Sequence, residues 1–145
     1  MPADDAVAAL RGASLRVTKQ RVAVLTALEL HPHADVDQLG RIVREELGSV
    51  STQAIYDVLT ALSGARLVRR LETGQRARFE LRRHDHDHVV CRGCGAVADV
   101  DRAGDPAPPG YTRTHGFRVD ESEVLHWGLC PECRPGVHRN RRRFP

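Results

Sequence analysis

The stretch "STQAIYDVLTALSGARLVRRLETGQRARFEL", residues 51–81, decides the fold because its periodicity changes halfway along. The first half repeats apolar residues at helical spacing from Ser51, which can cap a helix, to Gly64, which can end one. The second half contains two short runs, 67–71 and 76–81, joined by Glu-Thr-Gly-Gln. This length and turn chemistry predict a β-hairpin. A helix followed by a hairpin is therefore expected.

The residues before this stretch predict further helices. A weak helical pattern covers residues 3–11, and Thr18 can cap a second helix that stops at His31-Pro32. Asp35 can cap a third helix, whose apolar residues recur every three or four positions until Gly48. Helices followed by a hairpin within about 80 residues form a winged helix-turn-helix. We predict this fold for the first part of the chain.

Charge is distributed unevenly along the chain. Residues 1–83 carry thirteen Lys and Arg against ten Asp and Glu, whereas residues 84–138 carry five against nine. Residues 139–145 include four arginines. A basic first part suits a polyanion, and an acidic second part rich in His and Cys suits cations. We predict a winged-helix domain at 1–83, a metal-binding domain at 84–138 and a basic flexible tail at 139–145.

The second domain is predicted to contain strands. Strand-like segments occur at 88–90, 96–100, 117–119 and 124–127. Phe117 and Trp127 are large apolar residues of these segments, and we predict that they lie in the core of the domain. The whole chain is thus expected to be an α+β protein.

Composition excludes several classes of protein. The chain has 145 residues, 41% of them apolar, which suffices for a core. No apolar run approaches the roughly 20 residues that span a bilayer, and Asp4 and Asp5 stand where a signal peptide has a basic start. We therefore expect a cytoplasmic protein with no membrane partner. In that reducing compartment the four cysteines are expected to bind metal rather than form disulfides.

The cysteines form two pairs with metal-binding spacing. Cys91 and Cys94 make one Cys-x-x-Cys pair, and Cys130 and Cys133 make another. Each pair can supply two thiolates to one tetrahedral ion, and four thiolates close a structural Zn²⁺ site. The alternative, four inert buried cysteines, does not account for the paired spacing.

A second group of metal ligands precedes the first cysteine pair, in "HDHDHVVCRGCG", residues 84–95. If this segment is a strand, a period of two places His84, His86 and His88 on one face and the intervening aspartates on the other. Two imidazoles at i and i+2 can chelate one ion. Candidates for its remaining ligands are His33, Glu80 and Asp99. Such a mixed shell suits Fe(II), Mn(II) or Zn(II), and the alternative is a solvated, weakly cation-binding edge.

The helix predicted from Ser51 has a polar face that suits nucleic acid. Gln53, Tyr56 and Thr60 lie at i, i+3 and i+7, where amide and hydroxyl groups can reach base edges and phosphates. Basic residues of the hairpin and of the second helix can hold the phosphate backbone. The predicted DNA-binding residues are Arg16, Lys19, Arg21, Thr52, Gln53, Tyr56, Thr60, Arg76 and Arg78. The alternative is the ordinary solvated face of an amphipathic helix.

Six segments of the chain occur in the order found in one family. They are "LRVTKQRVAVL", "HPHAD", "STQAIYDVL", "GARLV", "HDHDHVVCRGCG" and "WGLCPEC", within about residues 10–134. On these segments the chain resembles the ferric uptake regulator family. The resemblance implies a homodimeric repressor that binds double-stranded operator DNA. It also implies an N-terminal winged helix, a small C-terminal α/β dimerisation domain and a regulatory metal between them.

The resemblance implies roles for individual residues. It carries structural zinc onto Cys91, Cys94, Cys130 and Cys133, and the regulatory metal onto His33, Glu80, His86, His88 and Asp99. The regulatory ion is expected to be Fe²⁺, with Mn²⁺ or Zn²⁺ as alternatives. Two positions depart from the family. Asp57 stands where many members have a basic residue, and Ser122 stands where some members have a further ligand histidine, so no third metal site is assigned.

The segments "AIYDVL" and "WGLCPEC" are most similar to the redox-responsive branch associated with catalase-peroxidase genes. This similarity implies control of oxidative-defence or metal-homeostasis genes, with peroxide and Fe(II) oxidising a ligand histidine. A zinc, manganese or nickel uptake regulator is the alternative within the family. A thiol redox-switch chaperone is the alternative outside it. An enzyme with a small organic substrate is not expected, because four thiolates leave no position for water on the zinc.

Overall fold

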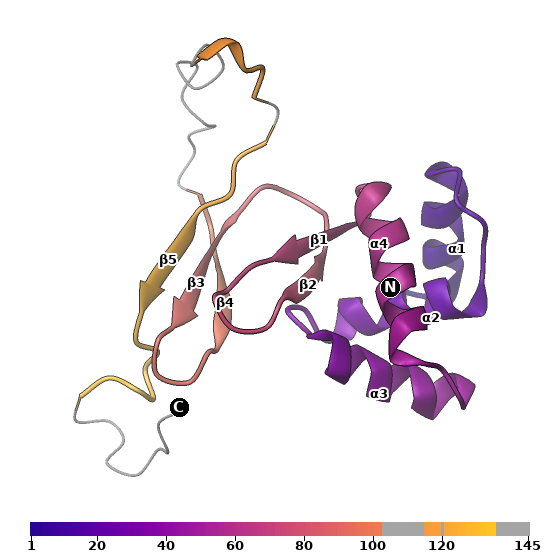
Figure 1. Ribbon diagram of the computed structural model, residues 1–145, viewed down its shortest axis with the longest axis horizontal. Coiled ribbons are helices and arrows are strands. Elements are labelled where there is room, and N and C mark those ends of the chain that lie inside the picture. The colour runs from indigo at the N-terminus through magenta and orange to yellow at the C-terminus, as the bar shows by residue number, and fades with distance from the viewer. Residues whose placement is uncertain (103–114, 120, 136–145) are drawn as a thin grey trace. The chain divides into compact units, whose positions relative to one another are not determined.

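The structure, a computed structural model, describes residues 1–102, 115–119 and 121–135. The chain divides into two compact units, Met1–Arg83 and His84–Pro145 (Figure 1). The predicted tail at 139–145 lies outside the described residues. The α+β fold class is confirmed, because the described residues form helices in the first unit and small sheets in both units.

The fully described first unit begins with the helices α1 (Ala3–Gly12), α2 (Lys19–Leu30), α3 (Val36–Leu47) and α4 (Thr52–Gly64) (Figure 1). The three N-caps predicted from the sequence are confirmed, since each cap accepts a bond from the third following amide. The bonds are Arg21 N–H to Thr18 Oγ1 (3.2 Å), Gln38 N–H to Asp35 Oδ1 (2.8 Å) and Ala54 N–H to Ser51 Oγ (3.0 Å). None of the described helices has the length and hydropathy needed to cross a bilayer.

A hairpin follows α4. Its strands β1 (Val68–Leu71) and β2 (Arg78–Leu81) pair antiparallel and begin one and two residues later than predicted. Ala34, between α2 and α3, forms an isolated bridge with Phe79 of β2. Phe79 N–H donates to the Ala34 carbonyl (3.0 Å), and His33 N–H donates to the Phe79 carbonyl (2.9 Å). These bonds complete the predicted winged helix-turn-helix and hold the backbone around His33 against β2.

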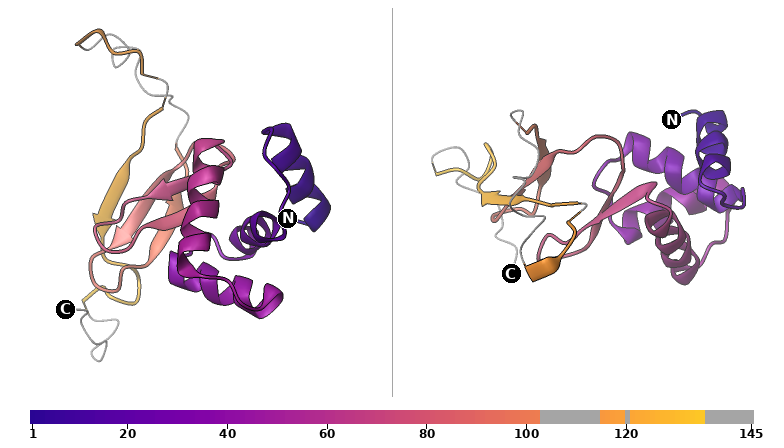
Figure 2. Two further views of the ribbon diagram at one scale, coloured as in Figure 1. Left: turned by 45° about the vertical axis from the view of Figure 1, so that its right-hand side comes forward. Right: turned by 90° about the horizontal axis from the view of Figure 1, so that it is seen from above.

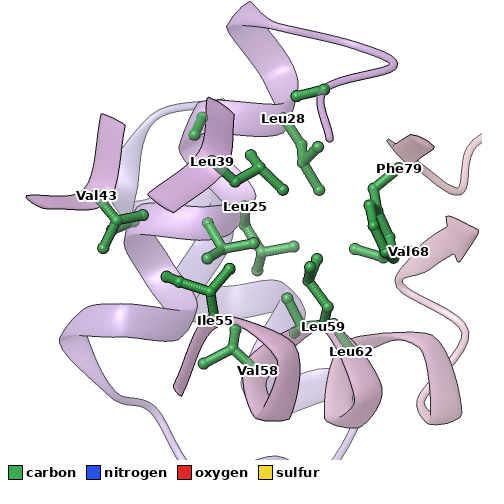
Figure 3. Packing of buried hydrophobic residues seen from close by; sticks show 14 of the residues in the cluster. Leu25, Leu28, Leu39, Val43, Ile55, Val58, Leu59, Leu62, Val68 and Phe79 are labelled. Carbon is green, nitrogen blue, oxygen red and sulfur yellow. The ribbon is translucent and has the colours of Figure 1, made fainter. Parts of the chain in front are cut away.

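One hydrophobic core joins the helices and the hairpin of the first unit (Figure 3). Its most deeply buried side chains include Leu25, Leu28, Leu39, Ile55, Leu59, Leu62 and Val68. Burying a leucine or isoleucine side chain contributes roughly 1.5–3 kcal/mol relative to leaving it exposed. Helix α4 supplies three of these residues from one side, which fixes its orientation and leaves its opposite face to solvent.

The described residues of the second unit form a three-stranded sheet in the order β4-β3-β5, seen again in Figure 2. The strands are β3 (Asp87–Cys91), β4 (Val97–Val100) and β5 (Leu125–Gly128). Strand β4 pairs antiparallel with β3, and β5 pairs parallel with it. Directly opposed residues of paired strands share a face. One face therefore carries the opposed residues His88 and Asp99, and the other carries Asp87 and His126.

Two predictions for the second unit are wrong. Residues 117–119, predicted as a strand, have irregular backbone and join no sheet of the described residues. Phe117 and Trp127, predicted to be in the core, are 70% and 42% exposed in the single chain. A short alternation of apolar residues supplies no partner strand by itself, and so small a sheet cannot bury both of its faces.

Candidate metal centres and nucleic-acid interface

The four cysteines of the second unit lie together. Their sulfur atoms are all within 4.8 Å of one another, and Sγ of Cys94 lies 3.8 Å from Sγ of Cys130. Zn–S bonds of about 2.3 Å in a tetrahedron place neighbouring sulfurs roughly 3.8 Å apart. All four are free thiols. The predicted cluster of Cys91, Cys94, Cys130 and Cys133 is confirmed, and its geometry fits a structural Zn²⁺.

The surroundings of Cys91 and Cys133 show why this cluster suits a cation. Amide groups of Gly93 and Cys130 donate to Sγ of Cys91, each at 3.3 Å. Burial opposes the thiolate of Cys91, but these hydrogen-bond donors outweigh burial and lower its pKa to about 6. Burial and the neighbouring sulfurs raise the pKa of Cys133 to about 12. One thiolate is thus stable alone, whereas four so close together need a divalent cation to offset their repulsion.

Gly93→Ala should weaken zinc binding. A Cβ at this position would lie 3.0 Å from both Cβ and Sγ of Cys133, so the two Cys-x-x-Cys turns would have to move apart. Overpacking of this kind costs about 1–3 kcal/mol, which corresponds to a loss of zinc affinity of about fivefold or more. Competition with a chromophoric chelator measures it. Gly128→Ala is the matched control, because a Cβ there meets nothing within 4 Å. Equal zinc affinities for the two variants would contradict the close contact.

Two of the predicted regulatory ligands lie together in the first unit. Nε2 of His33 lies 3.3 Å from Oε2 of Glu80, and the two side chains are only 13% and 5% exposed. His33 adopts a φ of 68°, which is uncommon for a residue other than glycine. Nη1 of Arg69, a neighbour that the sequence did not reveal, lies 3.8 Å from Oε1 of Glu80 and offsets its buried charge. The pair is positioned to hold a cation.

The other three predicted ligands lie together in the second unit. Nε2 of His86 and Nε2 of His88 lie 3.3 and 3.4 Å from Oδ1 of Asp99. Ligand atoms bound to one ion at about 2.1 Å lie roughly 3.0–3.4 Å apart, so this spacing fits a metal. Nδ1 of His86 bonds to the carbonyl of His84 (2.9 Å), which orients the ring as second-shell bonds do.

The histidine alternation differs from the expectation at its first member. Strand β3 begins at Asp87, so His84 precedes it and is exposed. His86 and His88 are 6% and 0% exposed. These two contact Asp99, whereas the exposed ring of His84 lies beside that of His86, with 5.1 Å between the ring centroids.

The predicted DNA-binding residues of α4 share its exposed face. They are Thr52, Gln53, Tyr56 and Thr60. Tyr56, 44% exposed, lines a groove of about 300 Å³ together with Arg70 and Arg76. Gln53 Nε2 donates to Oδ1 of Asp57 (2.9 Å), which leaves the amide oxygen of Gln53 pointing away from that bond. The carboxylate of Asp57 thus holds the amide group of Gln53 in one orientation.

The predicted basic residues near the start of α2 are not all exposed to solvent. Arg16 and Lys19 are exposed. Arg21 is partly buried, and its Nη1 donates to the carbonyl of Arg16 (2.7 Å). The structure thus brings the three residues to one end of α2, with Arg21 bracing the backbone of Arg16.

The arginines of the hairpin differ from each other. Arg76 is 66% exposed, and its Nη1 lies 2.6 Å from Oδ2 of Asp37. Arg78 is partly buried, and its Nη1 donates to the carbonyl of His33 (3.3 Å). Arg76 is therefore at the surface, whereas Arg78 supports the backbone of a proposed metal ligand.

The contacts of Arg102 with Asp87 and Ser122 in the second unit were not predicted from the sequence. Nε of Arg102 donates to Oδ1 of Asp87 (2.6 Å), and Nη2 of Arg102 donates to the carbonyl of Ser122 (3.1 Å). The bond from Arg102 lowers the pKa of Asp87. Fifteen positions separate the two charged residues, and no local spacing rule marks such a pair.

The winged helix, the thiolate cluster and the histidine–carboxylate groups define a metal-binding winged-helix protein. A model of the ferric uptake regulator family matches residues 12–124. The transcriptional regulator FurA of Mycobacterium tuberculosis is 54% identical over 127 residues, which cover 86% of this chain and 86% of that protein. The chain belongs to the ferric uptake regulator family of transcriptional regulators, which confirms the resemblance carried by the six segments.

Two further relatives extend the comparison. The peroxide-responsive repressor PerR of Staphylococcus epidermidis is 27% identical, with 90% of this chain and 89% of that protein covered. The structure of the ferric uptake regulator from Pseudomonas aeruginosa with manganese has a TM-score of 0.71 at 28% identity. That match covers 87% of this chain and 98% of the Pseudomonas chain. The two-unit fold is therefore shared with a solved member of the family.

Proposed function

We propose that the chain is a metal-dependent, DNA-binding transcriptional repressor, linked to Fe²⁺ and responsive to peroxide, that controls oxidative-defence or metal-homeostasis genes. The 54% identity to FurA and the similarity to PerR support this function. The mixed imidazole and carboxylate donors suit Fe²⁺, with Mn²⁺ or Zn²⁺ as alternatives. When bound, Fe²⁺ would reduce peroxide and break its O–O bond, and the oxidant so formed would oxidise one of the ligand histidines, with peroxide as the overall electron acceptor.

The observation that carries the proposal is that each unit holds part of a ligand set at metal-binding separations. The first unit contributes His33 and Glu80, and the second contributes His86, His88 and Asp99. We propose that all five bind one labile ion. The ion then favours a single relative orientation of the units, and an orientation that suits the operator raises DNA affinity by linkage.

The proposed repressor is a homodimer. Exposed apolar side chains in the second unit support a protein partner there, and they are Phe117, Val124, Trp127 and Leu129. Two copies of α4 can then enter successive major grooves of a double-stranded operator. In this proposal residues 1–83 bind DNA, residues 84–138 bind metal and dimerise, and residues 139–145 are a flexible basic tail. We further propose that this regulator acts in the cytoplasm, without a membrane partner, a catalytic activity or a small organic substrate.

The experiment that tests the function measures operator affinity at buffered free metal. The full-length, zinc-loaded protein is titrated onto labelled promoter DNA by fluorescence anisotropy with Fe²⁺, Mn²⁺, Zn²⁺ or Ni²⁺ under anaerobic conditions. We expect Fe²⁺ at micromolar or lower free concentration to raise affinity about 5- to 150-fold, the usual range of such coupling. Peroxide should reverse the effect of Fe²⁺ and not that of Mn²⁺. Response to Zn²⁺, Mn²⁺ or Ni²⁺ alone would favour an uptake regulator for that metal. An operator affinity that none of these metals changes would contradict the proposal.

Tyr56→Ala should weaken operator binding about tenfold or more without lowering the melting temperature, because Tyr56 is exposed on α4. Tyr56→Phe separates the two contacts that tyrosine can make. Loss in both variants indicates a phosphate contact through the hydroxyl, and loss in the alanine variant alone indicates packing on a thymine methyl. Arg41→Ala, an exposed change on α3, is the control and should bind normally. Full operator affinity in Tyr56→Ala would contradict the proposed interface.

A further inference from the structure

We propose that Arg102 is a positioning residue for the labile-ion site of the second unit. Its guanidinium joins three separate segments, and so holds the strand that carries His88 in register with the strand that carries Asp99. The inference rests on the proposed function, because it requires a labile ion at these ligands. It assigns to an arginine outside the ligand set the task of setting how tightly that ion binds.

The contacts of Arg102 reach the start of β3 and the segment just before β5. Arg102 follows the end of β4, and its Nε donates to Oδ1 of Asp87, the first residue of β3, at 2.6 Å. Its Nη2 donates to the carbonyl of Ser122 at 3.1 Å and lies 3.5 Å from the hydroxyl of Ser122, just before β5. Arg102 and Asp87 are only 17% and 15% exposed. One side chain therefore links the ends of all three strands.

The contact between Arg102 and Asp87 lies next to the metal ligands in the sheet. Asp87 pairs with Val100, and the next pair along the ladder is His88 with Asp99. Asp87 also lies between His86 and His88 in the chain, so fixing it fixes the backbone of both. A strand shifted by one residue would turn every side chain to the other face, and the ligands would no longer converge.

The charge of Arg102 serves the same purpose. Asp87 is a carboxylate beside two metal-binding histidines, and without a partner it would offer a competing oxygen ligand on the wrong face of the sheet. The charge-assisted bond from Arg102 occupies that carboxylate. The half-exposed His126, whose Nε2 lies 3.5 Å from Oδ2 of Asp87, is the other polar side chain that faces it among the described residues. Arg102 thus leaves Asp99 as the carboxylate that meets the two histidines.

The test titrates Co²⁺ into zinc-loaded, full-length protein and follows its visible absorption, with zinc content and melting temperature measured in parallel. Arg102→Gln should weaken Co²⁺ binding about tenfold, the lower end of the range for outer-shell partners, and alter the absorption bands, while zinc stays unchanged. Arg102→Lys should restore part of the affinity because it keeps the charge. Arg118→Gln, an exposed arginine of the same unit, is the matched control.

A second comparison keeps the inference falsifiable if Arg102→Gln is poorly folded. Asp87→Asn should weaken Co²⁺ binding to a similar extent, and the double variant should be no worse than either single one, since both break the same contact. Wild-type Co²⁺ affinity in Arg102→Gln or Asp87→Asn, or strictly additive losses, would overturn the positioning role. If the wild-type protein itself binds no labile Co²⁺, the proposed function fails instead, so the two failures are distinguishable.

Discussion

Cys130→Ser should abolish zinc binding and unfold the second unit while the first unit stays folded. Four thiolates at this separation need the divalent cation, and serine is a poor ligand for it. The unit has a three-stranded sheet and few fully buried apolar residues among those described, so it depends on the metal for stability. Zinc sites contribute about 10–16 kcal/mol to the folding of small metal domains. The folding free energy lost with the zinc site therefore exceeds the stability that the sheet provides by itself.

Elemental analysis and circular dichroism measure the two parts of this prediction. Zinc per chain should fall from one to none. The helical signal should persist, because the described helices belong to the first unit. Trypsin should cleave the second unit rapidly, whereas Arg134→Ala, an exposed change in the same knuckle, should resist as the wild type does. A zinc-free Cys130→Ser protein with a protease-resistant second unit would refute the structural role of the metal.

Local features of this fold could be predicted from sequence because their causes span only a few residues. Thr18, Asp35 and Ser51 each bond an amide three positions ahead, and a three-residue relation is visible in a sequence. Each Cys-x-x-Cys pair could be predicted for the same reason, because its two cysteines lie within one short turn. The pairing of the two knuckles was predictable because a closed site needs four thiolates.

Contacts between distant residues could not be predicted in the same way. Nη1 of Arg76 donates to Asp37, 39 positions away, a contact that the sequence did not reveal. Arg83 and Glu29 form an ion pair across 54 positions, and Arg102 meets Asp87 across fifteen. A charge has many possible partners along a chain, and only the fold selects one of them. The contact of Arg78 could not be predicted either. Its bond to the carbonyl of His33 depends on the bridge between Ala34 and Phe79, which brings residues far apart in the sequence together.

The metal ligands lie between these two cases. Alternation in "HDHDH" predicted that His84, His86 and His88 share a face, and the structure buries His86 and His88. It did not predict where the strand begins, so it did not distinguish the exposed His84, which precedes the strand, from the two buried histidines. Strand ends depend on pairing with other segments, which a period of two does not report.

His86→Ala should abolish the effect of labile metal on operator affinity while leaving zinc in place. His86 is 6% exposed, and its Nε2 lies 3.3 Å from Asp99, so removing its ring deletes a ligand and leaves a cavity beside the others. The cysteine cluster uses none of the same side chains. The wild-type protein should gain about 5- to 150-fold in DNA affinity on saturation with the ion, and the variant should gain none.

His84→Ala is the matched control for this change, because it removes an exposed imidazole two residues earlier and keeps the backbone carbonyl that His86 uses. It should retain the full metal response. His86→Gln preserves more of the buried volume and separates ligand loss from a packing defect, since glutamine fills the space but does not replace an imidazole. Anisotropy titrations with and without Fe²⁺, on protein of verified zinc content, provide the measurement. A normal metal response in both His86 variants would mean that the ion controlling DNA binding is held by other residues.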